Sequence, residues 1–153
     1  MPDLLTAIRD HLIDGGIARS PRTAGSLPPL RVAEDVPAPG ESPSGNATEI
    51  GPTTVLGVEY ATGLPSRPWE ASVRWDGARF VIRTLDTAEA LELYARLRGA
   101  FLHGAGDHIA GHLGFDMAGL WVIEARQWRA LQPLERSPQA RTYSCEFLFQ
   151  THA

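Results

Sequence analysis

The sequence predicts an α+β fold: an antiparallel sheet of two hairpins plus loose N-terminal strands, packed against two helices, with a long Pro/Gly-rich loop. Two segments repeat apolar residues at helical spacing, and several others alternate apolar and polar residues, as strands with one buried face do. The 153 residues are 43% hydrophobic and 21% charged, which is ordinary for a globular domain. We therefore expect one compact domain over residues 1–153, with a flexible insert at about 37–53.

The first expected element is an amphipathic helix over residues 3–14. Asp3 can cap its N-terminus, and Gly15 and Gly16 can end it. Four apolar side chains recur along one face at helical spacing: Leu4, Leu5, Ile8 and Leu12. A helix of this kind needs a hydrophobic partner that covers its apolar face.

Between residues 19 and 68 the composition changes. Most of the twelve prolines fall here, among many Gly, Ser and Thr residues. Short strands are predicted at residues 30–36 and 54–60, whereas the stretch at 37–53 lacks the apolar content to fold on its own. We expect that stretch to be a mobile loop that contacts a partner, not a separate domain.

The next stretch, EASVRWDGARFVIRT, predicts the first hairpin. Asp76 and Gly77 are a favoured pair for a type I′ turn, and apolar and polar residues alternate on both sides of them. Phe80 would face the core, while Arg79 and Arg83 would project away from it.

A second helix is predicted over residues 86–103. Asp86 and Glu89 have the spacing of a capping box, and Gly104 is suited to the C-terminal cap. The apolar residues of this helix form one expected stripe: Leu91, Tyr94, Leu97 and Phe101.

The C-terminal third predicts a second hairpin. Its strands are expected at residues 119–131 and 140–151, with a polar turn at 132–139 between them. In the last strand, alternation places four side chains on one buried face: Tyr143, Cys145, Phe147 and Phe149.

The segment between the second helix and the next strand is rich in potential metal ligands: His103, Asp107, His108, His112 and Asp116. His108 and His112 have the spacing of zinc ligands on one helix face. However, Gly111 disfavours a helix by about 1 kcal/mol, and no glutamate follows His108 as in zinc proteases. We therefore expect a polar loop, and keep a small histidine-metal hydrolase as the alternative.

No other segment predicts catalysis. Cys145 is the only cysteine, and burial on the aromatic face would make it unreactive. All 14 basic residues are arginine, which excludes Schiff-base chemistry and a phosphate-loop lysine. A net charge of -4 argues against a nucleic-acid binder held by phosphate contacts, and no apolar run is long enough to cross a bilayer. We expect no enzyme, no cofactor and no membrane association.

Charged side chains on different elements are candidates for contacts between subunits. Arginines of the expected hairpins and acids of the expected helices would lie on different faces, which suits subunits that meet head to tail in a ring. A solvated surface of mixed charge is the alternative. The candidate interface residues are Arg74, Arg79, Arg83, Arg126, Arg129, Asp10, Asp14, Glu89 and Glu92.

The order of these elements resembles the tail terminator proteins of long-tailed bacteriophages, also called tail completion or minor capsid neck proteins. The resemblance is carried by an N-terminal helix with the pattern LLxxIRxxL and a Pro-rich extended stretch. Then comes a strand that runs into a helix, ARFVIRTLDTAEALELYARLRGAFL, and last a long strand pair, GLWVIEARQWRALQPLERSPQARTYSCEFLFQTH. It covers most of the chain apart from the insert at 37–53.

The resemblance implies a structural virion protein of the tail or neck, assembled in the bacterial cytoplasm, without chemistry of its own. Family members form a homohexameric ring that caps the tail tube, ends its polymerisation and joins it to the stopper or connector of the head. The sheet tends to line the ring and the helices to lie outside. DNA would pass through the ring without specific binding. Another neck protein on a related scaffold, a stopper or connector component, is the alternative within this class.

Overall fold

The computed structural model describes residues 3–23, 25–32, 54–61, 73–102, 114–136 and 141–152. The loop expected at 37–53 and the histidine segment at 103–112 lie outside these residues. The fold class is confirmed at the level of a mixed α+β domain with two helices and one curled sheet.

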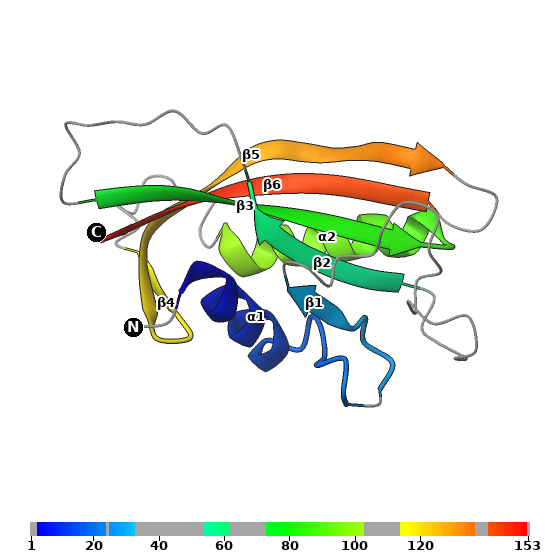
Figure 1. The fold of residues 1–153 in the computed structure, drawn as a ribbon, viewed down its shortest axis with the longest axis horizontal. Helices are drawn as coiled ribbons and strands as arrows, with labels where there is room; N and C mark the ends of the chain where they lie inside the picture. The colour runs from blue at the N-terminus through cyan, green and yellow to red at the C-terminus, as the bar shows by residue number, and fades with distance from the viewer. Residues whose placement is uncertain are drawn as a thin grey trace.

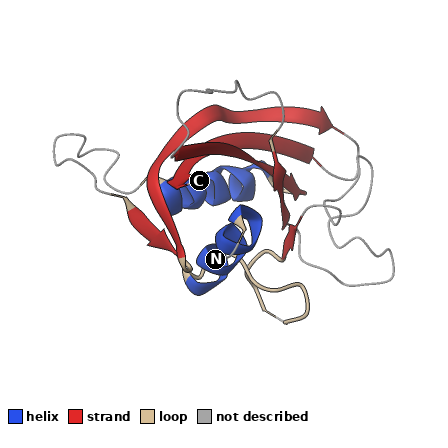
Figure 2. Ribbon diagram, turned by 60° about the vertical axis from the view of Figure 1, so that its left-hand side comes forward, coloured by secondary structure: helices blue, strands red, loops and turns tan. Residues whose placement is uncertain are grey.

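Six strands form the sheet in the order β1-β2-β3-β6-β5-β4, and the sheet curls around the two helices (Figures 1 and 2). β1 and β2 are parallel, and the other neighbouring strands are antiparallel. The elements are α1 (Leu4–Asp14), β1 (Leu30–Val32), β2 (Thr54–Tyr60), β3 (Val73–Thr84), α2 (Thr87–Phe101), β4 (Phe115–Met117), β5 (Leu120–Arg136) and β6 (Arg141–His152). Both helices lie against the concave face of the sheet, where the core is (Figure 2).

α1 begins and ends as the sequence predicts. The Asp3 carboxylate accepts a hydrogen bond from the Thr6 backbone N–H at 2.7 Å, so Asp3 is the N-cap. At the other end the N–H of Gly15 donates to the His11 carbonyl, and Gly16 has a φ of 71°, a conformation suited to glycine. The four apolar residues expected to share one face are all buried.

The N-cap supports a first prediction. The bond from Thr6 lowers the pKa of the Asp3 carboxyl below its usual 3.8. We expect Asp3→Ala to reduce the free energy of unfolding by about 1 kcal/mol at neutral pH. The folded-state pKa is the lower one, so the stabilisation is present above the unfolded pKa and is lost as the pH falls through the folded pKa. Urea unfolding at pH 7 and at about pH 2.5 should show the difference shrinking in acid. A difference that stays constant with pH would contradict this role.

The hairpin predicted around Asp76 and Gly77 is wrong. β3 runs without a turn from Val73 to Thr84, and Asp76 and Gly77 pair with residues 149 and 148 of β6. β3 is bounded by β2 on one side and by β6 along its whole length on the other. The cross-strand pairs that these long-range neighbours provide outweigh the local turn preference of Asp-Gly.

The predicted antiparallel pairing of the last two strands is confirmed, with a different boundary. β5 extends to Arg136, so residues 132–136, expected in the turn, belong to the strand. Residues 137–140, which join the two strands, lie outside the described part. The pairing of β5 with β6 contains four register shifts, between residues 122 and 135. Such bulges let a long strand bend with the curl of the sheet.

In the core, α2 packs against the concave face of the sheet through aromatic side chains. Phe101 at the end of α2 packs against the rings of Phe80, Phe147 and Phe149, with centroids 5.0–5.5 Å away. The predicted stripe of α2 is wrong in one position, because Leu91 is 56% exposed. The buried residues of this helix are instead Ala90, Leu93, Leu97, Ala100 and Phe101.

The N-terminus of α2 is tied to the sheet by polar side chains. Asp86 is the N-cap, as predicted, and accepts from the Ala88 N–H at 2.9 Å. Its own N–H donates to the Thr84 hydroxyl at 3.0 Å, and Glu89 accepts a hydrogen bond from Thr54 of β2. Glu89 therefore holds the helix against the sheet. The C-cap of α2 is Leu102, and the expected cap Gly104 lies outside the described residues.

Candidate functional site: the outer face of the sheet

The sheet has a second face, turned away from both helices, which we call the outer face. Along β6, Cys145 and Phe147 point to the core, so that Ser144 and Glu146 between them point to the outer face. Cross-strand partners share a face, and the register therefore places outer-face residues on β2, β3 and β5 as well. Most of the arginines predicted to mediate contacts lie on this face.

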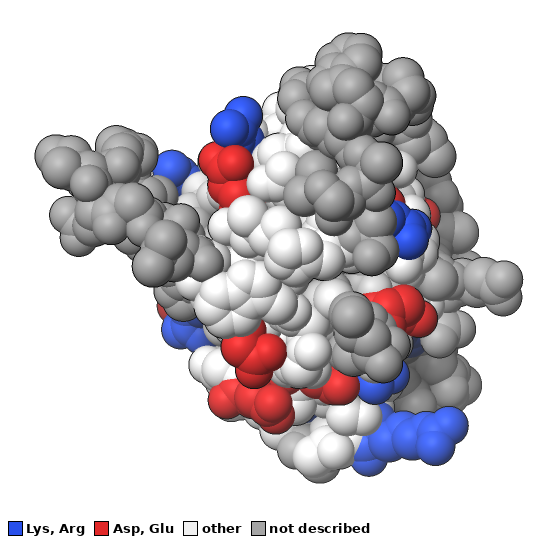
Figure 3. All heavy atoms as spheres, turned by 90° about the vertical axis from the view of Figure 1, so that its left-hand side faces the viewer, with Lys and Arg blue, Asp and Glu red and all other residues white. Residues whose placement is uncertain are grey.

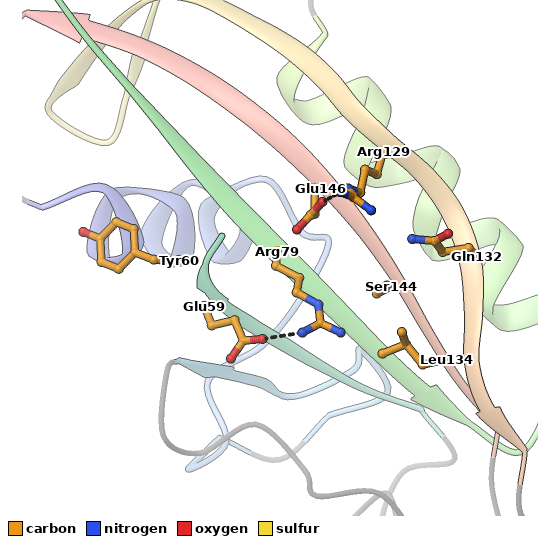
Figure 4. A pocket seen from close by; sticks show the side chains of 8 residues that line it. All are labelled: Glu59, Tyr60, Arg79, Arg129, Gln132, Leu134, Ser144 and Glu146. Atoms are coloured by element: carbon orange, nitrogen blue, oxygen red, sulfur yellow. Dashed lines mark hydrogen bonds and ion pairs between the residues drawn. The ribbon is translucent and has the colours of Figure 1, made fainter. Parts of the chain in front are cut away.

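Four charged residues form a row across the outer face. Glu59 of β2 pairs with Arg79 of β3, Arg79 with Glu146 of β6, and Glu146 with Arg129 of β5. We call these four residues the charge row. Ion pairs join its members, at 3.2 Å between Arg79 and Glu59 and at 2.7 Å between Arg129 and Glu146 (Figure 4). The row alternates in sign from strand to strand and is neutral in sum.

A groove of about 310 Å³ lies along the charge row (Figure 4). Its remaining lining residues are Tyr60, Gln132, Leu134 and Ser144. The groove contains neither histidine nor cysteine, and its two carboxylates are held in ion pairs with arginines. This set of side chains offers charged, amide and hydroxyl groups for polar contacts.

Two other candidate arginines, Arg126 and Arg74, also have acidic partners in the same chain. Arg126 pairs with Glu124 at 2.7 Å and lies over the Trp75 ring at 5.4 Å. Arg74 pairs with Asp76 at 2.7 Å. Each of these exposed guanidiniums is thus matched by a carboxylate on its own strand, which lowers its attraction for an external anion.

Arg83 contradicts the prediction that it projects to solvent. It is only 1% exposed, and Val55 and Val81, which belong to the same part of the outer face, are buried as well. The prediction placed Arg83 on the exposed face of a hairpin arm, whereas Arg83 and its cross-strand partner Val55 lie on a part of the outer face that is closed to solvent. Arg83 is therefore a buried residue of the sheet and not a surface contact of the described structure.

The candidate acids lie on the helices, as predicted. One of them, Glu89, makes a contact inside the chain instead of projecting from the surface. Asp10 forms an ion pair with Arg9 at 3.0 Å and Glu92 with Arg96 at 2.8 Å, and Asp14 is exposed. Glu89, by contrast, binds Thr54. Seen from the end that lies at the left of Figure 1, acidic and basic groups are interspersed among uncharged atoms (Figure 3). The surface there is of mixed charge.

Cys145 is a core residue. It is fully buried, and burial raises the pKa of its thiol to about 12. We expect native protein at pH 8 to react with a thiol reagent only as fast as it unfolds, because the thiolate is the reactive form. Reaction should be immediate in denaturant. Rapid labelling of the folded protein would contradict the burial of this side chain.

The same pKa shift predicts how this residue contributes to stability. The ordinary pKa of a cysteine thiol is 9.0, and the folded-state pKa of Cys145 is about 12. Its contribution is thus fully present below about pH 9 and is lost as the pH rises toward 12, since the unfolded chain ionises first. Cys145→Ala removes this contribution, so the variant should lose less stability than the wild type over that range.

The segment considered as an alternative metal site, and expected to be a polar loop, lies almost entirely outside the described residues. His103, Asp107, His108 and His112 lie outside the described residues, and Asp116 accepts a hydrogen bond from the Gly119 N–H in the tight β4–β5 turn. Within the described part of the chain, no three His, Cys, Asp or Glu side chains are grouped to hold a metal ion.

Two broader findings concern the chain as a whole. Neither α1 nor α2 is long and apolar enough to span a membrane. No protein-family model matches the sequence, and a search of curated proteins finds no significant match.

Proposed function

We propose that this protein is a structural virion protein that acts as a tail terminator, a homohexameric ring that caps the phage tail tube. The observation that carries the proposal is the outer face of the sheet, where Arg79, Arg126 and Arg129 are each held in an ion pair with a glutamate. The order of elements supports it as well: an N-terminal helix, extended strands, a strand running into a helix, and a long antiparallel pair at the C-terminus.

In such a ring the outer face would line the channel and the helices would lie outside. DNA binds to proteins mainly by replacing counterions on its phosphates with Lys and Arg. A channel through which DNA must move should therefore present few unmatched cations. The charge row meets this requirement, because Glu59 and Glu146 neutralise Arg79 and Arg129 directly on the surface.

The ring would end tube polymerisation and present its other rim to the stopper or connector of the head. It would be assembled in the host cytoplasm and remain in the tail or neck of the virion. The helix acids Asp10, Asp14 and Glu92 and the exposed arginines Arg74, Arg79, Arg126 and Arg129 stay candidates for the contacts between subunits. For Arg83 and Glu89 the in-chain positions described above argue against that role.

Deleting the gene from the source phage tests the proposal. We expect tails that grow past their normal length, with wild-type length restored when the protein is supplied. Electron microscopy of purified protein added to tail tubes should show a six-membered ring at one end. Tails of normal length on heads that leak DNA would indicate a stopper instead. Stoichiometric zinc and hydrolytic activity lost in His108→Ala would favour the histidine-metal hydrolase.

The neutral charge row gives a prediction for the purified protein. We expect Glu59→Gln with Glu146→Gln to bind duplex DNA at low salt more tightly than wild type, because two guanidiniums lose their carboxylates. Each freed cation should add about 0.9 to the slope of log K against log salt. Fluorescence anisotropy measures both quantities. Asp14→Asn, the same loss of one carboxylate charge per site at an exposed position of α1, is the control, and equal DNA affinity in all three proteins would contradict the role of the charge row.

A further inference from the structure

Among the described residues, only β4 pairs with the outer edge of β5, and it covers a small part of that edge. β4 pairs only with residues 120–122 of β5, and beyond that point no other described strand lies beside this edge. The opposite end of the sheet is covered, since the Leu30 N–H of β1 donates to the Arg19 carbonyl at 2.9 Å. An uncovered edge presents backbone N–H and C=O groups to which another strand can pair.

Only a short part of this edge has a regular geometry. The register of β5 against β6 shifts at Ile123 and again at Trp128, and residues 124–127 between them pair without interruption. Trp128, which lies at the second of these shifts, is 48% exposed. An added strand needs evenly spaced hydrogen-bonding groups, so residues 124–127 are where it can pair.

The charged side chains of residues 124–127 are complementary to the same residues of a second, antiparallel copy. Glu124 and Arg126 are two residues apart and share the outer face, with 42% and 60% of their side chains exposed. We propose that the β5 edge pairs with the same edge of a second copy, antiparallel about a two-fold axis at Ala125. Opposite residues in an antiparallel pair lie on the same face. Glu124 would thus face Arg126 of the partner subunit, and Arg126 would face Glu124 of the partner subunit.

The neighbouring structure limits the length of this contact. In the proposed register Trp128 falls next to Val122 of the partner subunit, where β4 of that copy already occupies the edge. The pairing therefore ends there, and the exposed indole is covered by the end of the partner's β4. A contact of this length is small compared with a standard protein interface, so the dimer is weak and depends on protein concentration.

This dimer is a state of the free chain and does not rest on the proposed function. One edge cannot pair with two strands at once. The dimer and any larger assembly that uses the β5 edge therefore exclude each other.

Charge reversal tests the pairing by sedimentation velocity over a concentration series. We expect a reversible monomer–dimer equilibrium for the wild type. Glu124→Arg and Arg126→Glu should each weaken self-association by at least about tenfold, because each places like charges opposite one another twice. A 1:1 mixture of the two variants should restore the dimer, since the all-basic run of E124R then faces the all-acidic run of R126E. Arg22→Glu, an equal charge change in an exposed loop, should behave as wild type.

The pairing would be overturned by a wild type that stays monomeric at every concentration, by variants that dimerise as well as wild type, or by a mixture that stays monomeric. A six-membered ring that neither reversal affects would also overturn it, while leaving the proposed function standing. Circular dichroism of each variant establishes that the fold is retained, as expected for exposed side chains.

Discussion

Replacing Phe101 with alanine is expected to reduce the free energy of unfolding by about 3–5 kcal/mol. The Phe101 side chain is 1% exposed and lies where α2 meets the sheet. It contacts Phe80, Phe147 and Phe149, and His11 of α1 lies 6.0 Å away, between ring centroids. Its removal leaves a cavity among elements from both ends of the chain. Because a typical domain is stable by about 5–15 kcal/mol, this is a large share of the total.

Urea or thermal unfolding followed by circular dichroism measures this effect. Leu91→Ala is the matched control, since Leu91 lies on the same helix and is 56% exposed. We expect it to change the free energy of unfolding by no more than about 0.5 kcal/mol. Comparing the two variants also distinguishes the observed structure, in which only Phe101 is buried, from the sequence pattern, which assigned Leu91 and Phe101 to the same buried stripe. Equal losses in the two variants would contradict the observed orientation of α2.

The second large effect is expected at Gly114, which leads into β4. Its φ is 93°, and a Cβ atom there would stand 2.3 Å from the Val122 carbonyl oxygen and 3.2 Å from the Ile123 Cα. We expect Gly114→Ala to cost roughly 2–5 kcal/mol, since it combines a left-handed conformation with a forced shift of the β5 backbone. The loss should appear as a lower unfolding midpoint in urea with an unchanged m-value.

Gly99→Ala is the control for this substitution. Gly99 lies within α2, where a Cβ meets nothing within 4 Å. The same chemical change is therefore expected to stabilise the protein by about 0.5–1 kcal/mol, because alanine is the better helix former. A Gly114→Ala variant as stable as wild type would show that β4 does not approach β5 as closely as described.

The proposed ring and the proposed dimer use different parts of the sheet. The ring requires that the charge row face a channel, and the dimer requires that the edge of β5 be accessible in the free chain. Glu59 and Glu146 belong to the first requirement, and Glu124 and Arg126 to the second. The two proposals can therefore be tested independently. Tail length is the readout for variants at Glu59 and Glu146, and the state of association is the readout for variants at Glu124 and Arg126.

Sequence alone determined the features that depend on neighbouring residues. The cap at Asp3, the helix after it and the bounds of β2 were predicted correctly, because capping and apolar periodicity act within a few residues. The buried face of β6 followed from alternation in the same way, with Cys145 among its aromatic residues. The α+β class follows from these elements together.

Only the tertiary structure decided which strands are neighbours, and the functional surface depends on that. Asp76 and Gly77 lie within β3 instead of in a turn, because β2 and β6 flank β3. Arg83 is buried beside Val55, its cross-strand partner on the distant strand β2. The charge row joins positions 59, 79, 129 and 146, which no local pattern connects. Pairing between distant strands is set by the burial and register of the whole sheet, and local propensity contains no information about it.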